Sequence, residues 1–566
     1  MTGSFDTTQS IQCILLTILI VLTSTRVYTT VRFYLSRYRT SRPPIPYTIP
    51  WIGHLFQMTS SLTEYISSVR QNYPTDPLVT IKLAGRRAHI IFDSKLVGQV
   101  HRQPKTMTFE PTGINVAFGV PQKDNEIMMS KSSDRVEGDC SGYQDLHNSL
   151  VGALEGENLE RMIQFFLNQL NKNLDHEFAS AADCQRAHSE SVDLCAWVKR
   201  HYTLAAIPYL FGTRILDMWP TLNEDFWHFD SHLIGLALPL PAFACRKGNH
   251  ARQKMIDGMR CWEDRAMKNR PLSQMKKTEP DWDDYWGERL TRERHRLLLD
   301  SGLSERGRAG FHLGFLWAQN ANTVPIGLWM LIHTLLDPVL HENVRAAAES
   351  CRKADGTFDL HALVTNPILK SLFLEALRFG VAVAPLRAVT ESTLLGGQYY
   401  LQKGDLVFLP AQAAQMDAGI WSSSFTGMKA MDPRSDPQHF WAGRFMDHDK
   451  SGEDQPLAPS VIETDSSPRM AASYRVEALS LPAGVRSKQL RSQLSHVRPF
   501  GGGHWLCPGR NLSMYEIISG LAVLVCRLDI QVEEDILQSQ GEPRPDCSRV
   551  GGMDPDRPFV VKIQPR

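Results

Sequence analysis

Cys507 is the residue of this chain whose surroundings most clearly favour chemistry. Three consecutive glycines, residues 501–503, precede it by four to six positions, and a Pro-Gly pair follows it. Residues 511–524 are apolar at the spacing of a buried helix, so the cysteine stands at a helix N-terminus, after a loop that glycine allows to bend tightly. Free N–H groups and the positive end of the helix dipole favour a thiolate at that place. The alternative is a thiol that is simply buried beside a glycine turn.

The spacing of this loop, F-x-x-G-x-x-x-C-x-G, is formed by Phe500, Gly503, Cys507 and Gly509. The pattern resembles the haem-binding loop of the cytochrome P450 family, the haem-thiolate monooxygenases. The resemblance implies haem b as cofactor and Cys507 as the thiolate ligand of its iron. It also implies one large domain that is mainly α-helical with small β-sheets.

The loop departs from the family two positions before the cysteine. The family usually carries a basic residue there that pairs with a haem propionate, whereas this chain has Trp505. The propionate partner is therefore expected to be the neighbouring His504 or a residue elsewhere. By resemblance, residues 381–387 should turn toward the haem, which makes Arg387 a candidate.

A second stretch, residues 310–331, is apolar nearly all round and predicts an interior helix. Pro325 cannot donate a hydrogen bond to the carbonyl of Ala321 and crowds it, so the helix is expected to bend there. By resemblance, Thr323 is the alcohol of the family's acid–alcohol pair for proton delivery, and Asn322 replaces the usual carboxylate. An amide orders water but does not transfer protons as a carboxylate does, so we expect proton delivery through water or another group. A capping or back-bonding role for the Thr323 hydroxyl is the alternative.

The motif Ala-Asn-Thr-x-Pro at residues 321–325 is similar to the sterol hydroxylases of bile-acid synthesis, a branch that includes prostacyclin synthase. The first functional hypothesis is a monooxygenase that takes electrons from NADPH through NADPH–cytochrome P450 reductase. Its substrate would be a lipophilic sterol, terpenoid or other specialised metabolite. The second is a reductase-independent isomerase or dehydratase, and the third is a haem- or sterol-binding protein without activity.

Residues 366–380 carry the signals of a helix, with an Asn cap, a Pro in the first turn and a Gly at the end. Glu375 and Arg378 are three positions apart and so share a face of this helix. By resemblance they form the family's E-x-x-R pair. Arg444, in a segment similar to F-x-P-E-R-F, would complete a buried Glu–Arg–Arg network that supports folding and the haem loop.

The N-terminal region predicts a membrane anchor. Residues 11–27 are mostly apolar, and several arginines follow them rather than precede them. This favours an uncleaved anchor over a cleaved signal peptide and puts the rest of the chain in the cytosol. The proline-rich residues 43–50 make a stiff spacer, similar to the hinge of microsomal family members. We therefore expect a single-pass anchor over residues 1–40 in the endoplasmic-reticulum membrane and a cytosolic haem domain over residues 41–566.

The amino-acid composition argues against some classes of binding partner and metal centre. Lys+Arg and Asp+Glu both number 61, so the chain lacks the basic excess that nucleic-acid binding requires. The 10 cysteines are scattered without a C-x-x-C pair, which argues against a zinc or thioredoxin-like centre. The nine cysteines other than Cys507 are expected to be reduced, partly buried thiols of a protein that faces the cytosol.

Shorter patterns predict the remaining elements. Residues 78–83 and 88–92 are expected to be strands, and residues 397–409 a hairpin. Residues 106–119 have the composition of a loop, which by resemblance would cover the haem. Residues 447–492 are polar and are predicted to be a flexible insertion in the haem domain.

Two segments are candidate contact surfaces. Residues 233–243 are apolar and broken by proline, and the basic run 246–250 follows them. They form either a buried loop or a segment that dips into the membrane surface. A group of basic residues before the haem loop would dock an acidic reductase or simply form a solvated face: Arg486, Lys488, Arg491 and Arg498.

Overall fold

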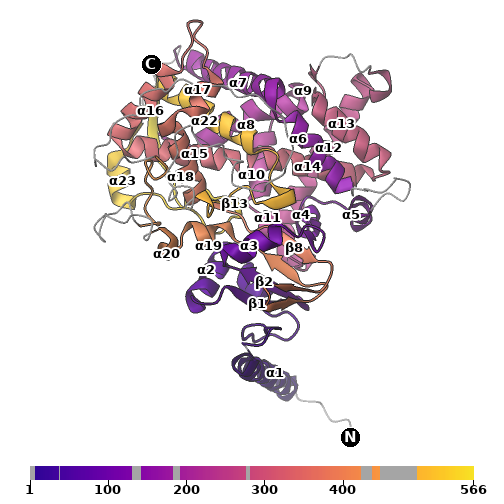
Figure 1. The fold of residues 1–566 in the computed structure, drawn as a ribbon. Coiled ribbons are helices and arrows are strands. Elements are labelled where there is room, and N and C mark those ends of the chain that lie inside the picture. The colour runs from indigo at the N-terminus through magenta and orange to yellow at the C-terminus, as the bar shows by residue number, and fades with distance from the viewer. Residues whose placement is uncertain are drawn as a thin grey trace. The chain divides into compact units, whose positions relative to one another are not determined.

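A computed structural model describes residues 7–36, 38–130, 142–182, 191–275, 281–421, 436–446 and 494–566. The chain is mainly helical with small β-sheets, as predicted (Figure 1). It divides into two compact units. The smaller comprises Met1–Pro111, Val383–Ala414 and Gly501–Trp505, and the larger comprises Thr112–Ala382, Gln415–Phe500 and Leu506–Arg566. The predicted insertion, residues 447–492, lies outside the described residues.

The smaller unit begins with the long helix α1 (Thr7–Ser36). Its stretch Ser10–Ser36 is long and apolar enough to cross a membrane, with a mean hydropathy of 1.8. This is longer than the predicted apolar segment because the helix continues through Arg26, whose guanidinium donates to the carbonyl of Pro46 at 2.6 Å. The other helices of this unit are η1 (Leu55–Met58), α2 (Leu62–Asn72), α3 (Ser94–His101) and η7 (Gly503–Trp505), and α19 (Ala411–Gln415) begins in it.

A five-stranded sheet in the order β1-β2-β11-β8-β3 forms the core of the smaller unit. β1 (Leu78–Leu83) and β2 (Arg86–Ile91) correspond to the two strands predicted at residues 78–83 and 88–92, and they pair antiparallel. The remaining strands of the sheet are β3 (Met107–Phe109), β8 (Leu386–Val389) and β11 (Leu406–Phe408). β11 runs parallel to β2 and antiparallel to β8.

The hairpin prediction for residues 397–409 is wrong. β10 (Tyr399–Leu401) pairs back with β9 (Thr393–Leu395), while β11 joins the larger sheet. Gly396 and Gly397 both have positive φ, 61° and 72°, and so reverse the chain directly after β9. The loop prediction for residues 106–119 also needs correction, since this segment contains β3 and the short helix α4 (Thr112–Ala117).

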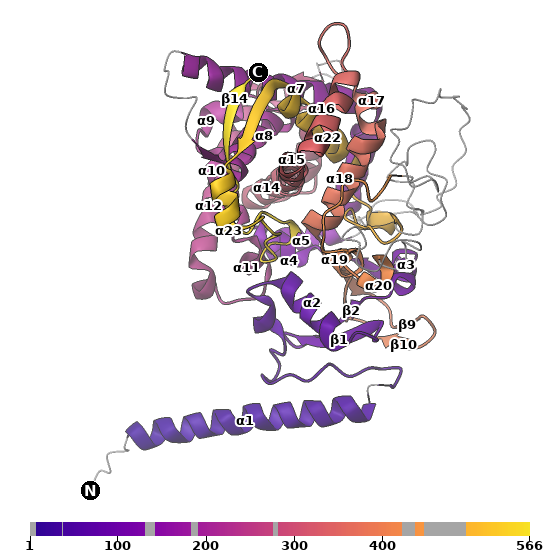
Figure 2. The ribbon, with the colours of Figure 1, turned by 90° about the vertical axis from the view of Figure 1, so that its left-hand side faces the viewer.

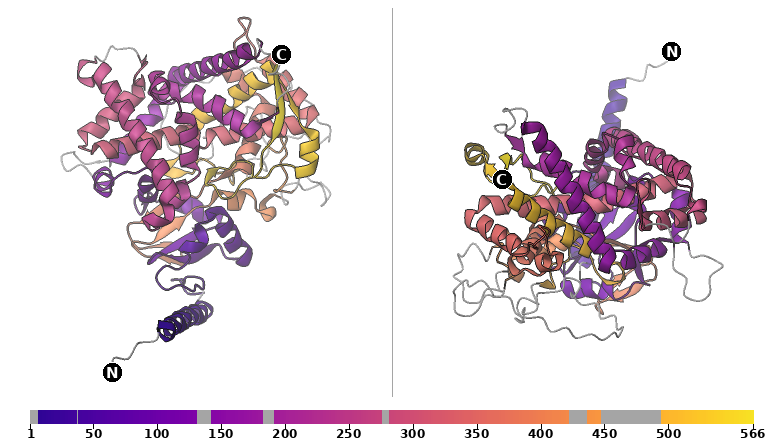
Figure 3. Two further views of the ribbon diagram at one scale, coloured as in Figure 1. Left: turned by 180° about the vertical axis from the view of Figure 1, so that it is seen from behind. Right: turned by 90° about the horizontal axis from the view of Figure 1, so that it is seen from above.

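The helix α15 (Thr323–Leu336) lies in the interior of the larger unit and continues α14 (Glu305–Asn320) after a break (Figure 2). It packs against α8 (Leu194–Phe211), α16 (Pro338–Ser350), α18 (Pro367–Gly380) and α22 (Arg510–Arg527). Figure 3 shows the long α7 (Gly156–Ala182) beside α22, with which it is in contact. α15 is buried nearly all round, as its apolar sequence predicts.

The other elements of the larger unit surround these helices. The remaining helices are α5 (Gln122–Met129), α6 (Gly142–Ala153), α9 (Arg214–Met218), α10 (Leu222–Asp230), α11 (Leu233–Ala237), η2 (Ala242–Cys245), α12 (Arg246–Asn269), η3 (Leu272–Gln274), α13 (Arg289–Asp300), α17 (Leu360–Thr365), α20 (Ala418–Trp421) and α23 (Glu534–Gln540). The strands are β4 (Val192–Asp193), β5 (Trp282–Asp283), β6 (Gly287–Glu288), β7 (Val381–Ala382), β12 (Leu528–Val532), β13 (Gly551–Gly552) and β14 (Val560–Pro565).

The apolar segment 233–243 divides into two parts. Leu233 and Leu236 on α11 are buried in the core, whereas Phe243 is 78% exposed. The basic run that follows forms the first turn of α12. The buried-loop interpretation therefore applies to α11, and the membrane-surface hypothesis remains for the residues around Phe243.

Candidate active site

Cys507 closes the loop that precedes α22. Its N–H donates to the carbonyl of Phe500 at 3.0 Å, and its own carbonyl accepts from Arg510 Nη1 at 3.1 Å. Burial raises the pKa of the Cys507 thiol, whereas the N–H of Gly509 and the charge of Arg510 oppose that rise. Among the described residues, no side chain forms a hydrogen bond with the sulfur, so the thiol is available as a ligand.

In the smaller unit, two residues of the glycine-rich segment have close neighbours. Gly503 has φ +68°, and a Cβ there would lie 2.5 Å from the carbonyl oxygen of His101, so only glycine fits. Trp505 packs on the ring of Phe109 with 5.3 Å between centroids. His504, the first propionate candidate, is exposed and meets the edge of Trp505.

Arg387, on β8, is a buried cation. Its side chain lies over the same Phe109 ring, 5.6 Å from the centroid, and Nη1 donates to the carbonyl of Leu386 at 3.3 Å. No carboxylate pairs with it in the part of the chain that the structure describes. Burial lowers the pKa of Arg387 to about 10. A buried guanidinium without a counter-ion is suited to bind an anionic group.

The interior helix breaks at Ala321 and Asn322, one turn before Pro325, where the sequence predicted a bend. Thr323 is the first residue of α15 and is 5% exposed. Its hydroxyl has no hydrogen-bond partner among the described residues, so it neither caps the helix nor bonds back to it. The Asn322 side chain instead accepts a hydrogen bond from the N–H of Gly552 at 2.9 Å, a contact that sequence reasoning missed.

Glu375, Arg378 and Arg444 lie together in the core of the larger unit. Arg378 donates to both carboxylate oxygens of Glu375, at 2.8 and 2.9 Å, and Arg444 Nε approaches the same oxygens at 3.0 and 3.1 Å. Burial opposes the charged carboxylate, but the two guanidinium groups hold the pKa of Glu375 below its ordinary value. The N–H of Trp441 adds a further hydrogen bond at 2.9 Å, so the network is satisfied on all sides.

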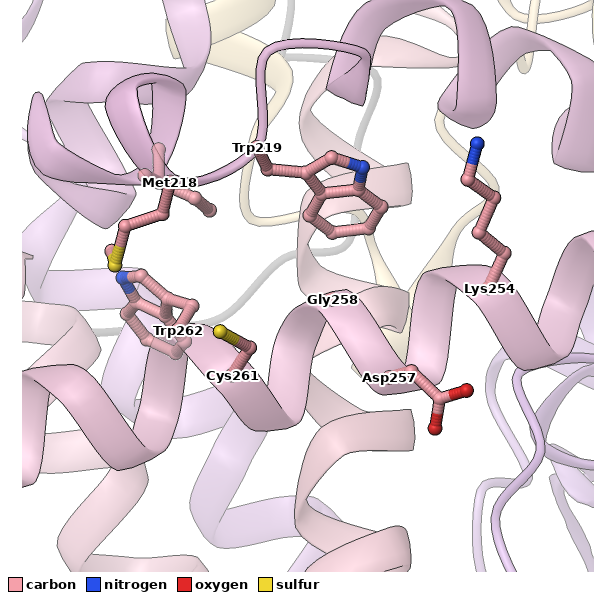
Figure 4. Close-up of a pocket in the computed structure, with 8 residues that line it drawn as sticks. Met218, Trp219, Lys254, Asp257, Gly258, Cys261 and Trp262 are labelled. Atoms are coloured by element: carbon pink, nitrogen blue, oxygen red, sulfur yellow. The ribbon is translucent and has the colours of Figure 1, made fainter.

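A separate pocket of about 260 Å³ lies between α9 and α12 (Figure 4). Its lining includes Met218, Trp219 and Cys261, and Gly258 lies so close to Trp219 that a Cβ would be 2.2 Å from the ring. None of the predicted site residues lines this pocket, so it does not belong to the candidate active site.

Of the predicted docking cations, Arg486, Lys488 and Arg491 lie outside the described residues. Arg498 is half-buried rather than on a solvated face, and its Nε donates to the carbonyl of Ser495 at 3.0 Å. Burial lowers its pKa. Arg498 is therefore a poor candidate for docking a partner.

A broken interior helix, a buried Glu–Arg–Arg network and a loop cysteine that opens the last long helix are together typical of haem-thiolate oxidoreductases. The family model described as cytochrome P450 matches residues 43–426, which is more than half of the sequence. The chain therefore belongs to the cytochrome P450 family. The match includes Thr323 and Glu375 but ends before Cys507. The assignment of Cys507 as the iron ligand therefore rests on the spacing of its own loop.

Curated relatives extend the similarity over most of the chain. The cytochrome P450 monooxygenase efuG of Hormonema carpetanum is 28% identical over 509 residues, covering 88% of this chain and 85% of that protein. The cytochrome P450 monooxygenase fsoE of Humicola fuscoatra is 28% identical over 516 residues, covering 88% and 84%. Cytochrome P450 7A1 of Oryctolagus cuniculus is 22% identical over 554 residues, covering 91% of this chain and 92% of that protein. The protein is thus an oxidoreductase enzyme of the P450 monooxygenase type.

The residues present fit the haem-thiolate iron that the family implies. Within the described ranges, no side chain competes for the Cys507 sulfur, and iron takes thiolate as a ligand. The Arg387 guanidinium likewise has no carboxylate partner there, and a propionate is the kind of anion that it would bind.

Proposed function

We propose that this protein is a haem-thiolate monooxygenase that inserts one oxygen atom from O2 into a lipophilic substrate, a sterol, terpenoid or other specialised metabolite. The observation that carries the proposal is the Cys507 thiol, which has no side-chain partner among the described residues and lies in a glycine-rich loop just before α22. Haem b, held by Cys507 and by Arg387 or His504, would supply dioxygen activation. Phe500, Gly503 and Gly509 shape the loop.

We assign proton delivery to the residues at the break between α14 and α15. The Thr323 hydroxyl has no protein partner among the described residues and can hold a water molecule by donating or accepting a hydrogen bond. The Asn322 Nδ2 amide is likewise free of a described partner and can donate to water. A proton would reach the site through such water, because neither side chain ionises.

The family's use of a redox partner and the apolar α1 helix support the cellular setting that we propose. Electrons would come from NADPH through NADPH–cytochrome P450 reductase. The Ser10–Ser36 stretch would anchor the protein by a single pass in the endoplasmic-reticulum membrane, with the catalytic part in the cytosol. The exposed Phe243, followed by basic residues, would touch the same membrane surface.

The test is a reconstitution of full-length protein with reductase, NADPH and oxygen-18 gas against a panel of sterols and terpenoids. Incorporation of one labelled atom is expected with the parent protein. The Cys507→Ala variant should lose both the incorporation and the thiolate-type carbon monoxide spectrum. Incorporation that survives in Cys507→Ala would overturn the assignment of the ligand.

A second function, rearrangement of an oxygenated substrate without reductase, is favoured by one observation. The break in the interior helix carries an amide in place of the family's carboxylate, and that amide is engaged by Gly552. Product that forms without NADPH and without label would establish an isomerase or dehydratase instead.

A further inference from the structure

Asn322 occupies the N-cap of α15, but its side chain does not cap the helix. An Asn at this position usually accepts from the N–H of the second or third helical residue. The third residue of α15 is Pro325, which has no N–H. The proline therefore removes one of the two usual capping donors, and the Asn322 side chain turns to a different partner.

That partner is the strand β13, which lies 230 residues further along the chain. The N–H of Gly552 donates to Asn322 Oδ1 at 2.9 Å. A Cβ on Gly551 would lie 2.3 Å from the same oxygen, and a Cβ on Gly552 would lie 2.9 Å from the Asn322 carbonyl and 3.2 Å from Pro325. The two consecutive glycines are therefore needed because Asn322 and Pro325 approach the strand so closely.

Further hydrogen bonds hold the same short strand against β7, α18 and α15. β13 pairs with β7, with Gly552 opposite Val381. The N–H of Met553 donates to the carbonyl of Gly380 at 2.8 Å, and its carbonyl accepts from the indole of Trp329 at 2.7 Å. Trp329 belongs to α15, so the strand contacts this helix at its first turn through Asn322 and further along through the indole.

A partly buried network of ion pairs holds the ends of this segment. Arg549 forms ion pairs with Asp230 and with Asp554, and Lys199 approaches Asp554 at 2.6 Å. Asp230 also accepts from the indole of Trp317 on α14, at 2.7 Å. Residues 549–554 are thus tied to the helices on both sides of the break at Asn322.

We infer that Asn322 is a positioning residue, which fastens the C-terminal strand β13 across the break that carries the free Thr323 hydroxyl. Asn322 Oδ1 already accepts the hydrogen bond from the N–H of Gly552, so this atom is not part of a proton path. The function of residue 322 therefore requires a hydrogen-bond acceptor rather than an acid. The strand then limits the space beside Thr323. This inference rests on the proposed function only where it concerns substrate, since the fastening itself is a property of the fold.

The test is amide hydrogen exchange of the full-length, haem-loaded protein in detergent micelles. In Asn322→Ala, loss of one hydrogen bond should speed exchange at Gly552 by about tenfold. Asn322→Asp keeps an acceptor at the same place and should exchange like the parent. Asn322→Ser, whose hydroxyl is too short to reach, should behave like Asn322→Ala and replaces it if that variant fails to fold.

Asn366→Ala is the matched control, because Asn366 caps α18 through the N–H groups of Ile368 and Leu369. It should speed exchange at those two amides and leave Gly552 unchanged. Unchanged exchange at Gly552 in Asn322→Ala, or equal acceleration in Asn322→Asp, would overturn the inference.

A second readout concerns the substrate. On any substrate that the oxygen-18 panel identifies, Asn322→Ala should alter the distribution of products and Asn322→Asp should restore it, a change that general loss of stability does not produce. A distribution that is the same in all three proteins would limit the role of Asn322 to the fold. If no substrate in the panel gives a product, this would count only against the proposed monooxygenase activity. The exchange rate at Gly552 tests the contact between Asn322 and β13 independently.

Discussion

Two Glu-x-x-Arg pairs in the larger unit have nearly the same geometry and opposite surroundings. In Glu375–Arg378 and in Glu349–Arg352, the arginine Nε lies 2.8 Å from one carboxylate oxygen, and Nη2 lies 2.9 or 3.0 Å from the other. The first pair is fully buried, whereas the side chains of Glu349 and Arg352 are 46% and 33% exposed. The four-residue motif therefore sets the fork-like contact but not its environment.

What distinguishes the buried pair is the set of additional partners. Arg444 provides a second cation, and the carbonyls of Gln415 and Pro437 accept from Arg378 at 3.0 and 2.7 Å. In water an ion pair contributes little, whereas in the interior each removed partner leaves a charge without compensation. The comparison shows that the importance of the network for folding comes from the second arginine and the backbone acceptors, and not from the Glu-x-x-Arg motif itself.

The largest effect is expected from Glu375→Ala, which leaves two buried arginines without their carboxylate. Breaking a buried pair in this way costs about 3–5 kcal/mol, a large part of a typical folding free energy. The yield of detergent-extracted, folded protein and the carbon monoxide spectrum of the haem-loaded protein should both fall sharply. Normal yield and spectrum would show that the network is dispensable for folding.

A second buried glutamate, Glu516 on α22, extends the comparison because no arginine pairs with it in the part of the chain that the structure describes. Its Oε1 is buried without a hydrogen-bond partner among these residues, and burial raises the pKa of Glu516 to about 8. Since the folded-state pKa lies above the ordinary 4.5, the protonated side chain contributes stability that is complete below pH 4.5 and is lost as the pH rises to about 8.

Within that window the loss from Glu516 is at most about 1.4 kcal/mol per pH unit. The Glu516→Gln variant stays neutral and should lose less thermal stability than the parent between pH 5.5 and pH 8. Melting curves at matched ionic strength measure this difference. Parallel curves for the two proteins would mean that Glu516 is ionised at neutral pH in the folded state.

Arg387 is a buried arginine that has no carboxylate partner among the described residues, so its removal should affect the cofactor and not the fold. In Arg387→Gln we expect haem loss to apomyoglobin to speed up by about tenfold, the worth of a hydrogen bond to a charged group. Arg294→Gln is the matched control, because Arg294 is also buried, donates to the carbonyl of Leu146 and lies over Phe315. Equal haem loss in the two variants would remove the proposed propionate role.

The smallest effect belongs to Glu349→Ala. The guanidinium of Arg352 lowers the pKa of Glu349 to about 2, but both side chains reach solvent. Exposed pairs contribute less than about 1 kcal/mol. The melting temperature and haem content should remain close to those of the parent, and a loss comparable to that of Glu375→Ala would refute the distinction drawn from burial.

Local sequence patterns predicted the parts of the molecule that local physics determines. The all-round apolar run predicted the interior helix, and Pro325 predicted its interruption to within one turn. The Asn366 cap and Pro367 predicted the start of α18, where Asn366 does accept from the first-turn amides. The geometry of Glu375 with Arg378 follows from their three-residue spacing on that helix.

Contacts between distant segments could not be predicted in the same way. β3 is only three residues long and exists because it pairs with β8, so residues 107–109 alone have the composition of a loop. The partner of β10 depends on where the glycine turn falls rather than on its own alternation. Nothing near Asn322 in the sequence indicates Gly552, although the Gly-Gly pair itself signals a close backbone approach.

The parallel pairing of β2 with β11 has a consequence for synthesis on the ribosome. β2 ends at Ile91 and its partner ends at Phe408. At the usual pace of translation, about 5–20 residues per second, the nascent chain exposes the unpaired edge of β2 for roughly 15–60 seconds. A free strand edge is a template for aggregation, so chaperones should bind this stage and truncation before residue 408 should yield insoluble protein. The smaller unit, which begins to leave the ribosome first, is therefore complete only after Trp505 has been synthesised.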